Sequence, residues 1–362
     1  MSVGPPSRIA IVGTGLLGAS IGLAVRGRAP HVHLVGTDPN RSHADAAHQR
    51  GALSSVADLE EAVAGADLVV LATPLDATPR LLDRLEELGT TAMITDVGSV
   101  KAPVVRYAAA RRLRFVGGHP MAGAAVSGPA HAEPLLFENA VWVLTPPNDA
   151  PPLPESAAEV LWLVQTLRAR AVVMSASRHD EVAAVVSHLP QLVAVSLVEA
   201  LADAGDDALA LAAGGFRDMT RIAGSPFSMW GPILRDNREV LAQALQAFGR
   251  RVSAMGEAVA TEPEELREAF ERAARVRGAL PTRSKGFLAP LADVVVWADD
   301  RPGFLHGLTG AIADAGLNVR DAELLRVREG EQGTFRFGFA TPAEADSARA
   351  ALTAAGYRAT RR

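Results

Sequence analysis

The sequence predicts an α/β protein in three parts, of which the first is a doubly wound parallel sheet. Short β-branched runs alternate with Ala/Leu-rich stretches over residues 8–145, and a glycine-rich turn follows the first run. Strands that alternate with helices typically form a mostly parallel sheet. A chain of 362 residues is too long for one ordinary core, so we expect two or three domains.

Six strand-length runs form the expected sheet: RIAIVG, VHLVGTD, DLVVLATP, AMITDVG, RFVGGHP and AVWVLTP. A proline-rich stretch at 145–157 follows the last run, and we therefore expect this domain to cover residues 1–148. Residues 156–282 have a helical pattern that includes the apolar run DEVAAVVSHLPQLVAVSLVEAL. A helix that is apolar on nearly every side is buried, either in its own domain or in a subunit interface.

A second linker is expected at residues 280–290, with the sequence LPTRSKGFLAP. Residues 291–362 then read strand, helix, strand, strand, helix, which is the pattern of a small α+β domain.

Charge and composition exclude several classes of function. Lys and Arg total 36 against 41 Asp and Glu, and no basic block is present, so a nucleic-acid partner is not expected. The chain has no cysteine, which excludes disulfides, zinc-thiolate sites and thiol nucleophiles. We also expect no metal site, because the histidines lack a matching array of carboxylates. No signal peptide or membrane span is apparent, and we expect a cytoplasmic protein.

The motif Gly13-Thr14-Gly15-Leu16-Leu17-Gly18 follows the first strand and begins a helix. Its glycines permit a tight turn, a close approach of the backbone to a pyrophosphate, and close packing of helix on strand. The second strand ends in Asp38, where a carboxylate can bind both ribose hydroxyls and repel a 2′-phosphate. The sequence therefore predicts a dinucleotide site that prefers NAD to NADP.

Three polar side chains follow the later strands, at the edge where an open α/β sheet binds its ligand. His119 lies in Gly-Gly-His-Pro and can accept a proton from an alcohol at neutral pH. Ser99 could hold the same hydroxyl, and Lys101 could face a substrate carboxylate. Thr73 and Pro74, after the third strand, should border the cofactor. A histidine beside a nicotinamide predicts a dehydrogenase.

The helical region adds Arg217 and Arg221, which share a helical face because they are four residues apart. Either could bind a carboxylate, although Arg217 could equally pair with Asp218 or Asp236. His179 and His188 flank the start of the long apolar run. His188 could equally be a hydrogen-bonded core histidine.

The motifs GTGLLG, DVGSVK, GGHPMAG, HDEVAAVVSHLP, GGFRDMTRIA and SPFSMWGPIL occur in this order and resemble the prephenate/arogenate dehydrogenase family. The resemblance covers essentially the whole chain. The tail, with DDRPGFLHGLTGAIADAGLNV, resembles an ACT regulatory domain, an arrangement of Gram-positive members of that family. The implied architecture is a Rossmann-type domain, an all-α dimerisation domain and a ferredoxin-like ACT domain.

The resemblance implies NAD-dependent oxidation and decarboxylation of prephenate in tyrosine biosynthesis. His119 would accept the proton of the C4 hydroxyl, Ser99 would orient that hydroxyl, and Arg221 would bind a substrate carboxylate. His179 and His188 would line or support the pocket. The protein would be a homodimer, and its ACT domain would sense an aromatic amino acid such as tyrosine.

Two departures from the family pattern leave the substrate open. Ala124-Ala125-Val126 replace the usual polar or charged residue after HPMAG, and Gln191 replaces the second histidine of SHLPH. Gln191 cannot carry a charge in the substrate pocket. Arogenate and 4-amino-4-deoxyprephenate are therefore alternatives to prephenate, as is neutral variation.

Two other interpretations compete with a prephenate/arogenate dehydrogenase. A β-hydroxyacid dehydrogenase would use a lysine from its long helix, and residues 177–216 contain none. A non-enzymatic amino-acid sensor could keep the fold without the chemistry, but Ser99, His119 and Arg221 are all present.

Overall fold

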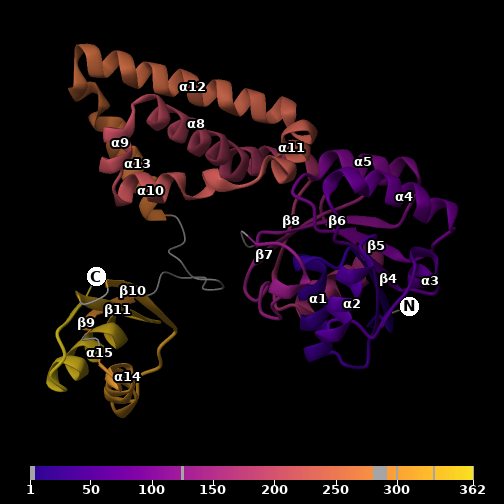
Figure 1. Cartoon of the computed structure of the whole chain (residues 1–362), viewed down its shortest axis with the longest axis horizontal. Helices are drawn as coiled ribbons and strands as arrows, with labels where there is room; N and C mark the ends of the chain where they lie inside the picture. Colours follow the sequence, from indigo (N-terminus) through magenta and orange to yellow (C-terminus); the bar gives the residue numbers. More distant parts are fainter. Residues whose placement is uncertain (1–4, 124–125, 280–291, 299–300, 329–330, 362) are drawn as a thin grey trace. The chain divides into compact units, whose positions relative to one another are not determined.

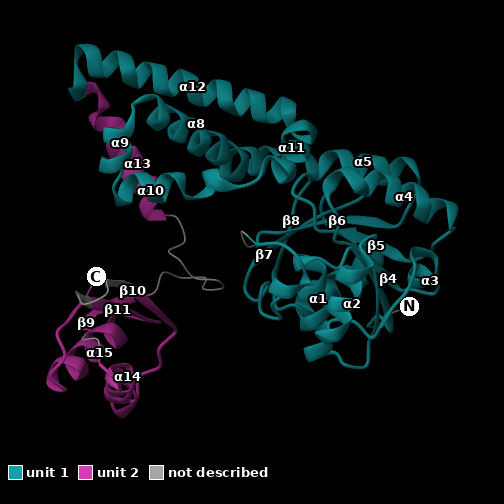
Figure 2. Cartoon of the chain, in the orientation of Figure 1, with its two compact units in different colours: residues 1–264 teal, residues 265–362 magenta. Residues whose placement is uncertain are grey.

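The computed structural model describes residues 5–123, 126–279, 292–298, 301–328 and 331–361. The chain divides into two compact units, residues 1–264 and 265–362 (Figure 2). The linker expected at 280–290 lies outside the described residues, as do Ala124 and Ala125. The expected domain limits of 1–148, 156–282 and 291–362 remain proposals.

The first unit contains an eight-stranded sheet in the order β3-β2-β1-β4-β5-β6-β7-β8. The strands are β1 (Arg8–Val12), β2 (His33–Thr37), β3 (Ser55–Val56), β4 (Leu68–Leu71), β5 (Met93–Asp96), β6 (Phe115–Pro120), β7 (Val141–Thr145) and β8 (Arg170–Val173). Neighbouring strands are parallel except β6 and β7. The carboxyl ends of β1, β4, β5 and β6 therefore meet at one edge, where this class of sheet binds its ligand.

Helices cover both faces of this sheet (Figure 1). Ile9 and Ile11 of β1 are buried with α1 (Leu16–Arg28) and α6 (Ala158–Thr166). Ala10 and Val12 point to the other face and are buried with α4 (Thr78–Glu87) and α5 (Ala102–Ala110). This burial on both faces explains why the strands are runs of apolar residues without a polar alternation. The helices α2 (Arg41–Gln49) and α3 (Leu59–Val63) complete this part.

One strand lies where the sequence pattern predicts only helix. β8 (Arg170–Val173) pairs in parallel with β7 and extends the sheet past residue 148. Its four residues follow α6 closely, and Arg170 and Ala171 are exposed at the edge of the sheet. A strand this short with an exposed, charged start has no clear alternation that sequence periodicity could detect.

The rest of the first unit is helical, as the sequence predicts. The segments are α7 (Ala176–Ala183), the π-helix η4 (Ala184–His188), α8 (Leu189–Asp203), α9 (Asp206–Leu211), α10 (Gly214–Thr220), the 3₁₀-helix η5 (Arg221–Gly224), α11 (Phe227–Asp236) and α12 (Arg238–Thr261). The long helix α12 lies beside α8 and η4 (Figure 1).

The second unit contains α13 (Arg267–Ala279) and a small α+β domain. The domain comprises β9 (Ala292–Ala298), α14 (Phe304–Asp314), β10 (Asp321–Arg328), β11 (Glu331–Phe339), α15 (Pro342–Ala354) and β12 (Ala359–Arg361). Its antiparallel sheet has the order β10-β11-β9-β12, which confirms the ferredoxin-like topology. β12 is a fourth strand that the sequence pattern does not predict, because only three residues pair.

Candidate active site

The glycine-rich turn between β1 and α1 has the backbone that a dinucleotide requires. Gly13 has φ of +90°, a conformation that favours glycine, and its N–H donates to Thr37 O at 2.8 Å. A Cβ atom on Gly13 would lie 2.4 Å from the carbonyl oxygen of Ala72, and one on Gly18 would lie 1.9 Å from that of Gly13. Both positions therefore exclude any side chain.

Gly15 precedes the first turn of α1 and leaves it open. No side chain caps this helix, and a Cβ atom on Gly15 would meet nothing within 4 Å. Leu16 and Leu17 follow in the first turn and are half-buried. Free amides at a helix N-terminus with open space in front of them fit a pyrophosphate.

Asp38 lies just after β2, beside the same turn. Its Oδ2 accepts hydrogen bonds from Thr14 N at 2.8 Å and Thr14 Oγ1 at 3.1 Å, and its Oδ1 accepts from Asn40 N at 2.9 Å. The carboxylate is thus held at the carboxyl ends of β1 and β2, the position expected for ribose recognition.

Thr73 and Pro74 follow β4 on the other side of Gly13. The Cγ2 atom of Thr73 lies 2.9 Å from where a Cβ on Gly13 would be, and its buried Oγ1 has no partner among the described atoms. Pro74 is exposed. Thr73 therefore adjoins the glycine turn, and the position of Pro74 beside a cofactor remains a prediction.

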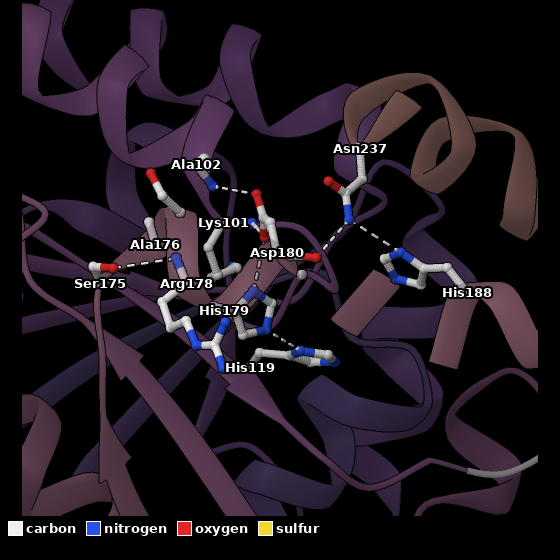
Figure 3. Close-up of polar contacts among 12 residues, drawn as sticks. Lys101, Ala102, His119, Ser175, Ala176, Arg178, His179, Asp180, His188 and Asn237 are labelled. Carbon is white, nitrogen blue, oxygen red and sulfur yellow. Dashed lines mark hydrogen bonds and ion pairs between the residues drawn. The ribbon is translucent and has the colours of Figure 1, made fainter. Parts of the chain in front are cut away.

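A relay of three side chains ends at His119 (Figure 3). Nδ1 of His119 lies 2.8 Å from Nε2 of His179, and Nδ1 of His179 lies 2.8 Å from Oδ1 of Asp180. The carboxylate can only accept, so in the neutral relay His179 donates through Nδ1 and accepts through Nε2. His119 then donates through Nδ1, which leaves a lone pair on its Nε2.

The environment keeps His119 neutral. Burial, with the neighbouring His179 and Lys101, lowers the pKa of His119 well below its usual range. Its Nε2 forms no hydrogen bond with the part of the chain that the structure describes. His119 therefore has the protonation state of a general base and a free nitrogen with which to act.

Asp180 is held by the sheet domain as well as by its own helix. Its Oδ1 and Oδ2 accept from the backbone N–H groups of Lys101 and Ala102, both at 2.8 Å, where α5 begins. Asp180 is not among the residues predicted from the sequence, although its position next to His179 is an available signal. The contact itself joins residues 79 and 78 positions apart and has no sequence signature.

The structure corrects the role expected for Lys101. Its side chain is completely buried, and its ammonium group is ion-paired with Asp96 and donates to Gly118 O at 2.9 Å. Burial lowers the pKa of Lys101, while Asp96 opposes this shift. An ammonium group with these partners cannot reach a substrate carboxylate; instead it supports the end of β6 that carries His119.

The other predicted residues lie in different environments. Ser99 is half-buried in the loop between β5 and α5, and Gln191 is buried in the first turn of α8. Arg217 and Arg221 are exposed in α10 and η5, and neither guanidinium group forms an ion pair within the described ranges. The expected alternative pairing of Arg217 with Asp218 or Asp236 is absent there too. The structure therefore joins His119 to His179, but does not place the two arginines in contact with them.

Comparison with known proteins now identifies the family. The profile of the nucleotide-binding domain of prephenate dehydrogenase matches residues 21–173, and that of its dimerization domain matches residues 175–272. The chain belongs to the prephenate dehydrogenase family. An ACT domain profile matches residues 292–351, which confirms the expected ACT domain at the C-terminal end of the chain.

Individual members of the prephenate dehydrogenase family agree with this assignment. Prephenate dehydrogenase from Bacillus subtilis is 35% identical over 91% of this chain and 91% of its own length. The crystal structure of the Aquifex aeolicus enzyme with hydroxyphenyl propionate and NAD+ has a TM-score of 0.70 and 29% identity, covering 77% of this chain and 99% of that one. Synechocystis arogenate dehydrogenase has a TM-score of 0.66 and 29% identity, covering 75% and 99%.

Proposed function

We propose that this protein is an NAD-dependent prephenate dehydrogenase that converts prephenate to 4-hydroxyphenylpyruvate and CO₂. The observation that carries the proposal is the free Nε2 of neutral His119, at the sheet edge that also carries the glycine turn. Homology to enzymes named for this reaction supports it.

Different residues of the chain have different roles in this reaction. Nε2 of His119 accepts the proton of the C4 hydroxyl as the C4–H bond breaks, and Ser99 orients that hydroxyl. Bound NAD+ supplies the acceptor for the hydride. Loss of the C1 carboxylate as CO₂ then makes the ring aromatic. Asp180, through His179, stabilises the imidazolium that forms on His119.

Substrate carboxylates need a cation, and Arg221 is our proposed partner for one of them. It has no ion pair among the described residues, so its guanidinium group is free for a ligand. An arginine that binds a carboxylate through two hydrogen bonds balances its charge and also fixes its orientation. His188 and Gln191, both buried near the start of α8, would form the neutral side of the pocket.

The protein acts on a small molecule and contains a dimerization domain, and we propose a homodimer. The helical stretch Ala176–Asp203 is long and apolar enough to span a membrane by length and composition, and only 28% of its apolar segment is buried. Its exposed apolar residues include Val185, Val186 and Val198. A second copy packed against these residues would cover them. We also propose a cytoplasmic location. The ACT domain would bind an aromatic amino acid such as tyrosine as effector.

The test is formation of NADH or NADPH with prephenate, arogenate and 4-amino-4-deoxyprephenate in parallel, each with NAD+ and with NADP+. We expect the highest kcat/KM for prephenate with NAD+. A preference for arogenate, the named substrate of the Synechocystis relative, would replace the proposed substrate and assign Gln191 to specificity. No turnover of any of the three would favour the sensor alternative.

A further inference from the structure

His188 lies on an unusual turn of helix. The π-helix η4 (Ala184–His188) separates α7 from α8, and Pro190 follows it at the start of α8. Proline has no N–H with which to bond the preceding turn, and a π turn inserts one extra residue into a helix, often at a functional site. Each residue turns a helix by about 100°, so this insertion redirects His188 relative to His179.

Asn237 holds this turn from a second direction. It lies between α11 and α12 and is 2% exposed. Its Nδ2 donates to the backbone O of Asp180 at 2.9 Å and lies 3.2 Å from Nδ1 of His188 (Figure 3). The amide group of Asn237 thus joins Asp180, at the opposite end of the relay from His119, to the histidine on the π turn.

The chemistry of these contacts defines the proton positions. A backbone carbonyl only accepts hydrogen bonds, so the Asn237 atom beside it must be the amide nitrogen. The second hydrogen of that nitrogen then faces Nδ1 of His188, which must offer a lone pair. A proton on Nδ1 would place two donors 3.2 Å apart with no acceptor between them.

We propose that Asn237 is a positioning residue that holds His188 as the neutral tautomer protonated on Nε2. His188 then offers a substrate oxygen a hydrogen-bond donor that carries no charge. The effect on catalysis rests on the proposed function, whereas the tautomer does not depend on which substrate is used.

The surroundings of His188 support a neutral ring. Burial lowers the pKa of His188 to about 4; nearby Asp180 opposes this shift and His179 adds to it. The ring of Trp230 packs edge-on, 6.0 Å away between centroids, and brings no charge. A cationic His188 would lower the pKa of His119 further and so weaken the base.

The first test measures the tautomer in the wild-type full chain by NMR of ¹⁵N-labelled histidines, with the His188 signals assigned by their loss in His188→Gln. We expect a protonated Nε2, an unprotonated Nδ1 and a neutral ring at pH 6. A proton on Nδ1, or a cationic ring at pH 6, would overturn the proposal whatever the enzyme oxidises. Failure to oxidise prephenate with the expected tautomer present would instead refute the proposed function.

The second test is Asn237→Asp, which keeps the shape but replaces the donor by a carboxylate. The new carboxylate should favour the tautomer protonated on Nδ1 of His188, because it can only accept a hydrogen bond from Nδ1–H, and its charge should raise the pKa of that ring. We expect kcat/KM to fall about tenfold or more, the scale of one lost hydrogen bond in a buried site. The control is Asn148→Asp, because the side chain of Asn148 accepts a hydrogen bond from Ala150 N in an exposed turn. An unchanged His188 tautomer in Asn237→Asp would contradict the assignment.

Discussion

Replacing Asp180 with asparagine should disable the base without removing a histidine. The carboxylate accepts three hydrogen bonds of 2.8 Å: Oδ1 from Lys101 N and His179 Nδ1, and Oδ2 from Ala102 N. An amide has one accepting oxygen, so it cannot satisfy all three donors. If its nitrogen faces His179, the tautomers of His179 and His119 both invert, and Nε2 of His119 carries a proton.

The opposite orientation of the amide also costs activity and stability. It keeps the bond to His179 but leaves the N–H of Ala102 facing another donor, an unpaired buried group that costs about 1–3 kcal/mol. In both orientations the negative charge that would stabilise the imidazolium of His119 is gone. We therefore expect kcat to fall about 10²–10⁴-fold, the range for general-base catalysis and for an inverted histidine tautomer.

Steady-state NADH formation and urea unfolding measure these two effects separately. Asp149→Asn is a matched control, because Asp149 accepts from Ser177 Oγ at 2.8 Å and from backbone N–H groups at the start of α7, but contacts no histidine. We expect it to lose stability with kcat almost unchanged. If Asp180→Asn kept wild-type kcat, the proposed relay would be refuted.

Three further predictions concern the base, its support and the cofactor. Protonation inactivates His119, and its lowered pKa moves the acid limb of kcat/KM below pH ~6.5; a limb centred above that pH would contradict the assignment. Lys101→Met leaves Asp96 buried without its partner and should lower the free energy of unfolding by about 3–5 kcal/mol. A loss under ~1 kcal/mol in urea titrations would show that the pair is dispensable. Asp38→Ala should lower kcat/KM for NAD+ about tenfold and leave NADP+ little changed; an unaltered cofactor ratio would remove Asp38 from cofactor selection.

Local sequence signals located the parts of the site that depend on one strand and its following turn. The turn from Gly13 to Gly18 and the end of β2 at Asp38 were predictable, because strand, glycines, helix and acid follow one another at fixed spacing. His119 was recognisable for a similar reason, since it lies at the end of an apolar strand.

Contacts between distant segments could not be predicted in this way. Asn237 contacts Asp180 across 57 residues, and neither its type nor its neighbours suggest this. Lys101 was misassigned because a lysine in a loop usually faces solvent. Its aliphatic chain passes beside Gly117, where a Cβ atom would be 3.2 Å from Lys101 Cδ. Only the assembled sheet places that glycine beside the lysine.

In the function that we propose, His119 is the base of an NAD-dependent oxidative decarboxylation. The most direct measurement follows NADH and CO₂ together from prephenate, with wild-type protein and with His119→Ala. We expect one CO₂ for each NADH from the wild type. For the variant we expect turnover lower by roughly 10²–10⁴-fold with unchanged NAD+ binding and an intact fold. Equal turnover by the two proteins would show that His119 is not the base.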